Sequence, residues 1–314
     1  MLQQTYNLGH LFVSMCIQAI QQTLKTLDKR GVIAEKILDE GWDKKEPYIF
    51  SGIGLRPSLM HLGHHLIVQL LSNMNCRGVP LVYQISNDEK RYLDDPKGDL
   101  QNTKKNTEEF LKQFKRYQWK KVYLIDNLRD KDDLRPIQEY INSKLPISKI
   151  SKLFGKKYDL YRASYTGRQL APIMLYNRQN PLGQPIIFTE RDQLPFFLAM
   201  RDLSPTLGLH KPQVIVLKPL KDIMMKDKMS SSDLKKAVLL DDLEKIKKAY
   251  SGRTKEEDFC LHFINYWESV TGKFCPVRLN EGKSKVLKED LIRFLSHKPS
   301  KSSKGENQKI LNLF

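Results

Sequence analysis

The stretch YIFSGIGLRPSLMHLGHHL, residues 48–66, begins with the pattern of a β-strand and ends with that of a helix. Its first half is mostly apolar, and glycines and a proline then mark the end of a strand. The last residues open the longer run LGHHLIVQLLSNM, in which apolar residues recur at helical spacing. A strand that leads into a helix in this way is the first half of a βαβ unit, so the stretch predicts an α/β fold.

Short apolar runs elsewhere in the chain predict further strands, and helical patterns such as residues 103–117 separate them. Several of these runs lack polar alternation, as expected for strands that are buried on both faces of a parallel sheet. The predicted strands are residues 48–53, 80–86, 121–126, 185–188 and 213–217. Together they predict a Rossmann-like parallel sheet that binds its ligand at the carboxyl ends of the strands.

These patterns divide the chain into three parts. Residues 1–46 are predicted to be an N-terminal helical extension, because apolar residues recur at helical spacing over about residues 8–40. Residues 47–227 hold the Rossmann-like domain with a helical insertion. Residues 228–314 have no strand pattern, so we expect an all-helical C-terminal domain that ends in a polar, basic tail.

The chain is strongly basic, with 53 Lys and Arg against 36 Asp and Glu and a formal net charge of +17. Such an excess attracts polyanions, which makes nucleic acid a candidate partner. Lysine is also the ordinary solvated surface residue, and composition alone does not decide between these interpretations.

Cysteine usage and hydropathy indicate the class of protein. Cys16, Cys76, Cys260 and Cys275 are scattered without a CxxC pair, which predicts reduced thiols in an intracellular protein. No apolar run approaches the ~18 residues that a membrane span requires. No secretory signal peptide is predicted either, because the apolar segment near the N-terminus has no preceding basic region.

Two histidines are expected where the first strand meets its helix. His61 and His64 would lie near the N-terminus of that helix, where free N–H groups and imidazoles can bind phosphate oxygens. Gly63 between them would let a ligand approach the backbone closely. The pattern HxGH is short, and a solvated or capping role explains it equally well. A metal site would need a third ligand, which no suitable spacing supplies, so none is predicted.

The segment DKMSSSD, residues 227–233, lies where the α/β pattern ends. A lysine ahead of three serines in a loop can reach a pyrophosphate and stabilise its developing charge. Taken alone, the segment is explained more simply as a serine-rich linker.

In this order, the two motifs resemble the paired signatures of the class I aminoacyl-tRNA synthetases. Residues 60–64 (MHLGH) correspond to the HIGH element and residues 228–232 (KMSSS) to the KMSKS element. Ser231, in place of the second lysine, is shared by the eukaryotic tyrosyl and tryptophanyl branch. The resemblance covers about residues 45–255, and it is strongest to the tryptophanyl enzymes of the eukaryotic and archaeal kind.

The resemblance implies a two-step reaction. Tryptophan would attack ATP, with Mg²⁺, to give tryptophanyl-adenylate and pyrophosphate, and the amino acid would then pass to tRNA(Trp). Residues 47–227 would be the catalytic domain, and residues 228–314 the KMSSS loop with a helical tRNA-binding domain. Members of this family are homodimers, and a cytoplasmic location is expected, with an organellar one left open.

The resemblance also assigns roles to individual residues. The catalytic residues would be His61, His64, Lys228, Ser230 and Ser232. ATP would be bound by Gly52, Gly63, His61, His64, Asp192, Lys228 and Met229. Tryptophan would be bound by Phe50, Gln84, Glu89, Gln169 and Gln193. The lysines that would meet the tRNA backbone, or else form a solvated helix face, are Lys235, Lys236, Lys245, Lys247 and Lys248.

Three stretches favour tryptophan over tyrosine as the substrate. VPLVYQISNDEKRYL (residues 79–93) and DQLPFFLAMRDLSPTLGLHKP (residues 192–212) resemble tryptophanyl patterns. In SYTGRQLAP (residues 164–172), Pro172 replaces the aspartate that binds the tyrosine hydroxyl in tyrosyl enzymes. A buried hydroxyl without a partner costs roughly 1–3 kcal/mol. Gln84 lies within an apolar run and therefore needs a polar partner.

Some positions depart from the family pattern. Phe50 replaces a tyrosine that would contact the indole N–H, and Glu190 and Arg191 replace a small neutral pair near the expected ATP ribose. The region after the KMSSS loop is shorter than in the family. Two alternatives therefore stay open: a tyrosyl-tRNA synthetase, and a synthetase-derived RNA-binding protein that has lost catalysis. A generic nucleotidyltransferase would explain HxGH but not KMSSS.

Overall fold

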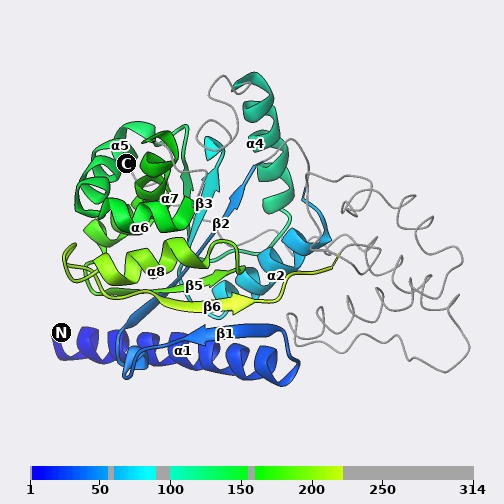
Figure 1. Cartoon of the computed structure of the whole chain (residues 1–314). Helices are drawn as coiled ribbons and strands as arrows, with labels where there is room; N and C mark the ends of the chain where they lie inside the picture. The colour runs from blue at the N-terminus through cyan, green and yellow to red at the C-terminus, as the bar shows by residue number, and fades with distance from the viewer. Residues whose placement is uncertain (1, 56–59, 90–99, 155–159, 222–314) are drawn as a thin grey trace, which may run out of the picture.

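The structure is a computed structural model, and it describes residues 2–55, 60–89, 100–154 and 160–221. A single six-stranded sheet runs through it in the order β1-β6-β5-β2-β3-β4 (Figure 1). All neighbouring strands are parallel except β1 and β6, which are antiparallel. The strands are β1 (Ile33–Ile37), β2 (Glu46–Gly54), β3 (Leu81–Ser86), β4 (Val122–Asp126), β5 (Gly183–Thr189) and β6 (Gln213–Leu217).

The α/β class and the parallel sheet are confirmed, and each of the five predicted strands is present within a few residues of its expected bounds. The predicted all-helical C-terminal domain and the KMSSS loop lie outside the described residues. The boundaries of the three predicted parts stay a prediction.

The N-terminal prediction needs one correction. Helix α1 (Leu2–Lys29) is present, but the helical pattern predicted to continue to residue 40 ends there. Gly31, with φ 67°, turns the chain into β1, and the 3₁₀ helix η1 (Trp42–Lys44) follows. β1 is an edge strand with three of its five residues exposed, so its sequence lacks the apolar run by which the other strands were recognised.

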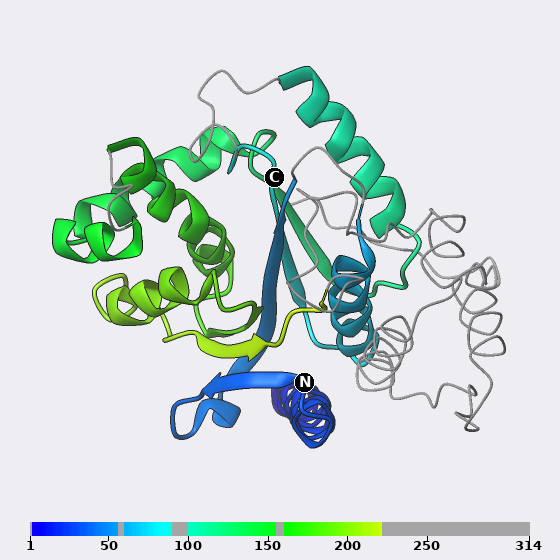
Figure 2. The same cartoon turned by 45° about the vertical axis from the view of Figure 1, so that its right-hand side comes forward.

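Helices cover both faces of the sheet (Figure 2). On one side lie α1, α2 (Leu62–Cys76) and α4 (Leu100–Phe114). On the other lie α5 (Lys131–Lys144), α6 (Ile147–Phe154), α7 (Leu160–Gln179) and α8 (Leu194–Leu203). Each side has its own apolar core. Successive side chains of β2 alternate between them, with Ile49 and Ile53 in the first and Tyr48 and Phe50 in the second.

The order of the strands determines where a ligand can bind. The chain runs from β2 to β3 and β4 on one side, and then returns to place β5 and β6 on the other side of β2. In open α/β sheets, such a reversal leaves a crevice at the carboxyl ends of the two strands that flank it. Here those strands are β2 and β5.

One histidine of the HLGHH run serves the fold. His65, on α2, is hydrogen-bonded through Nδ1 to the Tyr117 hydroxyl, and burial lowers the pKa of its imidazole to about 4. An unfolded histidine has a pKa near 6.5 and binds a proton below that pH. The unfolded state therefore takes up the proton first, and stability is lost as the pH falls from about 6.5 towards 4.

We therefore expect the free energy of unfolding to fall by about 3 kcal/mol between pH 7 and pH 4 through His65 alone. His65→Gln should flatten this part of the profile, as measured by urea unfolding at a series of pH values. His210→Gln is the control, because His210 is only partly buried beside Lys45 and the lowering of its pKa should contribute less than that of His65. Profiles of the wild type and His65→Gln with the same slope would contradict this account.

Candidate active site

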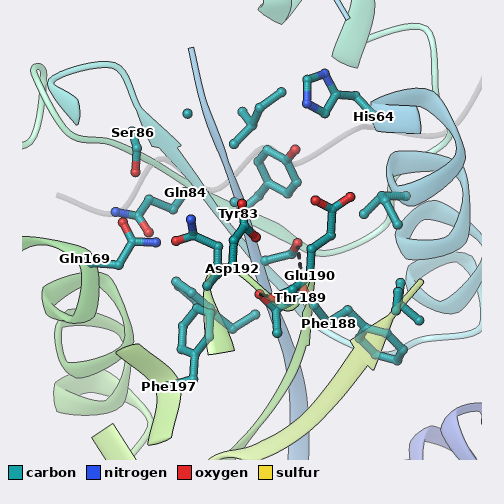
Figure 3. A pocket seen from close by; sticks show the side chains of 18 of the residues that line it. His64, Tyr83, Gln84, Ser86, Gln169, Phe188, Thr189, Glu190, Asp192 and Phe197 are labelled. Atoms are coloured by element: carbon teal, nitrogen blue, oxygen red, sulfur yellow. Dashed lines mark hydrogen bonds between the residues drawn. The ribbon is translucent and has the colours of Figure 1, made fainter. Parts of the chain in front are cut away.

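A cavity of about 430 Å³ lies at the carboxyl ends of β2, β3 and β5, at the reversal of the strand order (Figure 3). It is lined from the strand ends, from the N-terminus of α2, from α7 and from the start of α8. The predicted site residues that line it are Phe50, Gly52, His61, His64, Gln84, Glu89, Gln169, Asp192 and Gln193. The predicted site residues outside the described part of the chain are Lys228, Met229, Ser230 and Ser232.

His61 lies just before α2, and His64 lies within its first turn. His61 is the N-cap of α2, with extended φ and ψ of −87° and 169°, and its Nδ1 accepts a hydrogen bond from the His64 backbone N–H at 3.3 Å. The two rings nevertheless stack, with centroids 3.7 Å apart and planes 19° apart. The capping role considered for the HxGH pattern is therefore present for His61.

Gly63 accommodates the ring of His61. A Cβ atom on Gly63 would lie 3.0 Å from His61 Cε1 and 3.6 Å from the Leu220 Cβ. Gly63 is not among the residues that line the cavity. The space beside this glycine, expected to admit a ligand, is used by a side chain of the protein.

The glycines of β2 let two polar side chains approach the strand. A Cβ on Gly52 would lie 3.0 Å from both the Cβ and the carbonyl oxygen of Gln84. A Cβ on Gly54 would lie 1.9 Å from Glu89 Oε2. The carboxylate of Glu89 therefore lies directly against the backbone of Gly54, at the end of the strand.

Gln84 and Gln169 enter the cavity from β3 and α7 (Figure 3). Gln84 is 1% exposed, and its Nε2 donates to Asn127 Oδ1 at 3.3 Å. Its Oε1 has no hydrogen-bond partner in the described part of the protein. Gln169 Oε1 accepts from the Tyr165 hydroxyl at 2.8 Å. Of the two polar atoms of the Gln84 amide, only the nitrogen therefore has a hydrogen-bond partner among the described residues.

One wall of the cavity is apolar. Phe50 is buried and packs edge-on against Phe197, with ring centroids 6.1 Å apart. Phe50, which departs from the family pattern, thus supplies an aromatic surface without a hydroxyl. Pro172, on which the argument against tyrosine relied, is buried within α7 and does not line the cavity.

Glu190 and Arg191, the other residues that depart from the family pattern, face different directions. Glu190 follows the end of β5, is partly buried and lines the cavity with Asp192 (Figure 3). Arg191 between them is exposed and does not line it. The substitution of this pair therefore adds one carboxylate to the cavity wall and turns the cation outward.

Three buried polar residues beside the cavity were missed in the sequence. Asp88, Asn127 and Arg168 are joined by hydrogen bonds and by an ion pair whose side chains are 4% and 5% exposed. Asp88 lies in the tryptophanyl-like stretch 79–93 and Arg168 in the stretch 164–172, but the resemblance assigned no role to either. The one signal available for Asp88 was a charged residue two positions after the end of a buried strand.

Within the described residues, no group of three or more His, Cys, Asp or Glu side chains is arranged to hold a metal ion. Over the same residues, no helix is both long and apolar enough to cross a membrane.

Sequence comparison finds no matching family model but does find curated relatives. A cytoplasmic tryptophan–tRNA ligase of Dictyostelium discoideum is 30% identical over 246 residues, which are 71% of this chain and 61% of the relative. A tryptophan–tRNA ligase of Pyrobaculum calidifontis is 30% identical over 207 residues, 62% of this chain and 54% of the relative. The chain thus spans less than two thirds of the length of these relatives.

Solved structures share the fold. A tryptophanyl-tRNA synthetase of Encephalitozoon cuniculi bound to tryptophan gives a TM-score of 0.72 at 19% identity, covering 90% of this chain and 88% of that one. A tyrosyl-tRNA synthetase of Aeropyrum pernix gives 0.66 at 15% identity, covering 88% and 93%. The fold is common to both kinds, whereas the sequence relatives are tryptophan–tRNA ligases. The chain is thus similar in sequence to tryptophan–tRNA ligases, and it shares the fold of tryptophanyl- and tyrosyl-tRNA synthetases.

Proposed function

We propose that the chain is a tryptophan–tRNA ligase that activates tryptophan with ATP and then transfers it to tRNA(Trp). The observation that carries this proposal is the cavity at the strand reversal. It collects residues from five separate stretches of the chain that the family resemblance had assigned to tryptophan and ATP binding. Relatedness to tryptophan–tRNA ligases over 71% of the chain supports the same function.

Tryptophan would lie with its indole against the wall formed by Phe50 and Phe197. The indole N–H is a donor only, and Gln84 Oε1 is a buried acceptor without a partner in the described residues. Gln169 and Gln193 would contact the amino-acid end of the substrate, and Glu89 would complete the wall beside Gly54.

ATP would place its phosphates at the N-terminus of α2. The free backbone N–H groups and the dipole of that helix favour an anion there, and His64 lines the same part of the cavity. Mg²⁺ would arrive with the phosphates, because the described residues offer no cluster of their own for it. The chemistry needs no covalent enzyme intermediate, so positioning and charge stabilisation are sufficient. Lys228 and the serines after it would stabilise the departing pyrophosphate.

We also propose that the chain binds tRNA, forms a homodimer and is located in the cytoplasm. The net charge of +17 suits a tRNA backbone. A homodimer is proposed from the family resemblance, and a cytoplasmic location from the name of the Dictyostelium relative.

Pyrophosphate–ATP exchange tests the proposed first step. The purified full chain should incorporate labelled pyrophosphate into ATP when tryptophan is present, and not with tyrosine or without an amino acid. Exchange with tyrosine alone would show a tyrosyl enzyme. A folded protein that exchanges with neither amino acid but binds tRNA would show that catalysis has been lost, which contradicts the proposal.

Two glycine substitutions should separate the tryptophan and ATP ends of the cavity. Gly54→Ala places a methyl group where Glu89 Oε2 lies, and Gly63→Ala crowds the ring of His61. Because each neighbour is the far end of a side chain, both proteins should fold. We expect Gly54→Ala to raise the KM for tryptophan about tenfold, and Gly63→Ala to do the same for ATP, as loss of one good contact would.

Each variant is the control for the other in the same exchange assay. The assignment of the two ends would be wrong if both substitutions raised the two KM values equally, or if each acted on the other substrate.

A further inference from the structure

A buried ion pair lies behind the cavity. Arg168 Nε, on α7, donates to Asp88 Oδ2 at 2.7 Å, and both side chains are about 5% exposed or less. Arg168 Nη2 also donates to the backbone carbonyl of Asn127, which follows β4. The guanidinium thus holds a carboxylate from the end of β3 and a backbone group from the end of β4 in fixed positions.

This pair determines which way the amide of Asn127 faces. Asp88 Oδ1 accepts from Asn127 Nδ2 at 2.7 Å. A carboxylate paired with a guanidinium only accepts hydrogen bonds, so the neighbouring amide must turn its nitrogen toward it. Asn127 Oδ1 consequently points the other way.

Asn127 in turn orients the amide of Gln84. Asn127 Oδ1 is an acceptor, and Gln84 Nε2 donates to it at 3.3 Å. With its nitrogen used in this way, Gln84 directs Oε1 away from Asn127. That oxygen is buried, belongs to a residue that lines the cavity and has no hydrogen-bond partner in the described residues.

We propose that Arg168, Asp88 and Asn127 form an orienting network, which fixes the amide of Gln84 so that the cavity presents an acceptor to a ligand N–H. The inference rests on the proposed function for the identity of that ligand, since the indole of tryptophan carries such a donor. The three residues are positioning residues that act through Gln84. Their effect is a preference for tryptophan over a ligand of the same shape that lacks the N–H.

The test compares tryptophan with 3-(3-benzothienyl)alanine, in which sulfur replaces the indole N–H. Dissociation constants of both are measured by calorimetry on the full chain. Asp88→Asn is nearly isosteric and allows the Asn127 amide to turn over. Asn127→Leu removes the link to Gln84 while leaving the Arg168–Asp88 pair, in case Asp88→Asn does not fold. Thermal unfolding reports the stability of each variant.

The matched control is Asn87→Ser. Asn87 precedes Asp88 and is similarly buried. Its Nδ2 donates to Asp126 Oδ1 at 2.8 Å and to Thr107 Oγ1 at 3.2 Å, and its Oδ1 accepts from the Leu128 N–H at 3.0 Å, so none of these hydrogen bonds involves Gln84. We expect the wild type and Asn87→Ser to bind tryptophan at least about tenfold more tightly than the sulfur analogue. In Asp88→Asn and Asn127→Leu this ratio should fall to about threefold or less, mainly through weaker binding of tryptophan.

A purely structural role would lower stability and weaken both ligands alike. Folded variants that keep the wild-type ratio would therefore overturn the proposal, and so would a wild type that binds neither ligand. A wild type that binds tryptophan selectively but catalyses no pyrophosphate exchange would disprove the ligase function alone. The loss of selectivity in the two variants would still support the network.

Discussion

Parallel pairing of β2 with both β3 and β5 is the constraint on which the rest of the structure depends. Because the three strands run in one direction, the segments that follow them emerge at the same edge of the sheet. Those segments carry His61, Glu89 and Asp192, which are distant in sequence but line one cavity. A slip of one residue in β2 would exchange its side chains between the two apolar cores, so the close packing of both cores holds the register and, with it, the site.

The site also requires that the side chains of Gln84 and Glu89 approach the backbone at the end of β2 closely. Gly52 lies opposite Gln84 in the β2–β3 ladder, and Gly54 lies against Glu89. Side chains at either position would displace the polar groups that give the cavity its chemistry. The polar network behind Gln84 then depends on the same pairing, because Asp88 and Asn127 are held just past the ends of β3 and β4.

Local pattern was sufficient for much of the fold. The buried parallel strands are continuous apolar runs, and helix α2 follows from the helical spacing of the apolar residues after the first of these strands. The edge strand β1 was missed, because it is held by backbone pairing to β6 and not by an apolar face. The cap formed by His61 was an open alternative, since histidine is not among the usual N-cap residues.

Site residues that belong to a sequence motif could be predicted. Contacts between residues far apart in the sequence could not. The family motifs named most of the residues around the cavity. The ion pair of Asp88 with Arg168 joins positions 80 residues apart, and nothing in either local stretch indicates the other. The fold is shared by tryptophanyl and tyrosyl enzymes, so the architecture does not distinguish the two kinds.

The central claim is that the cavity at the strand reversal binds tryptophan and ATP together. A crystal structure of the full chain grown with tryptophan and the β,γ-methylene analogue of ATP tests it most directly. We expect the indole to lie against Phe50 and Phe197 with its N–H on Gln84 Oε1, and the phosphates to lie at the N-terminus of α2. Tryptophan bound elsewhere while this cavity stays empty would contradict the account.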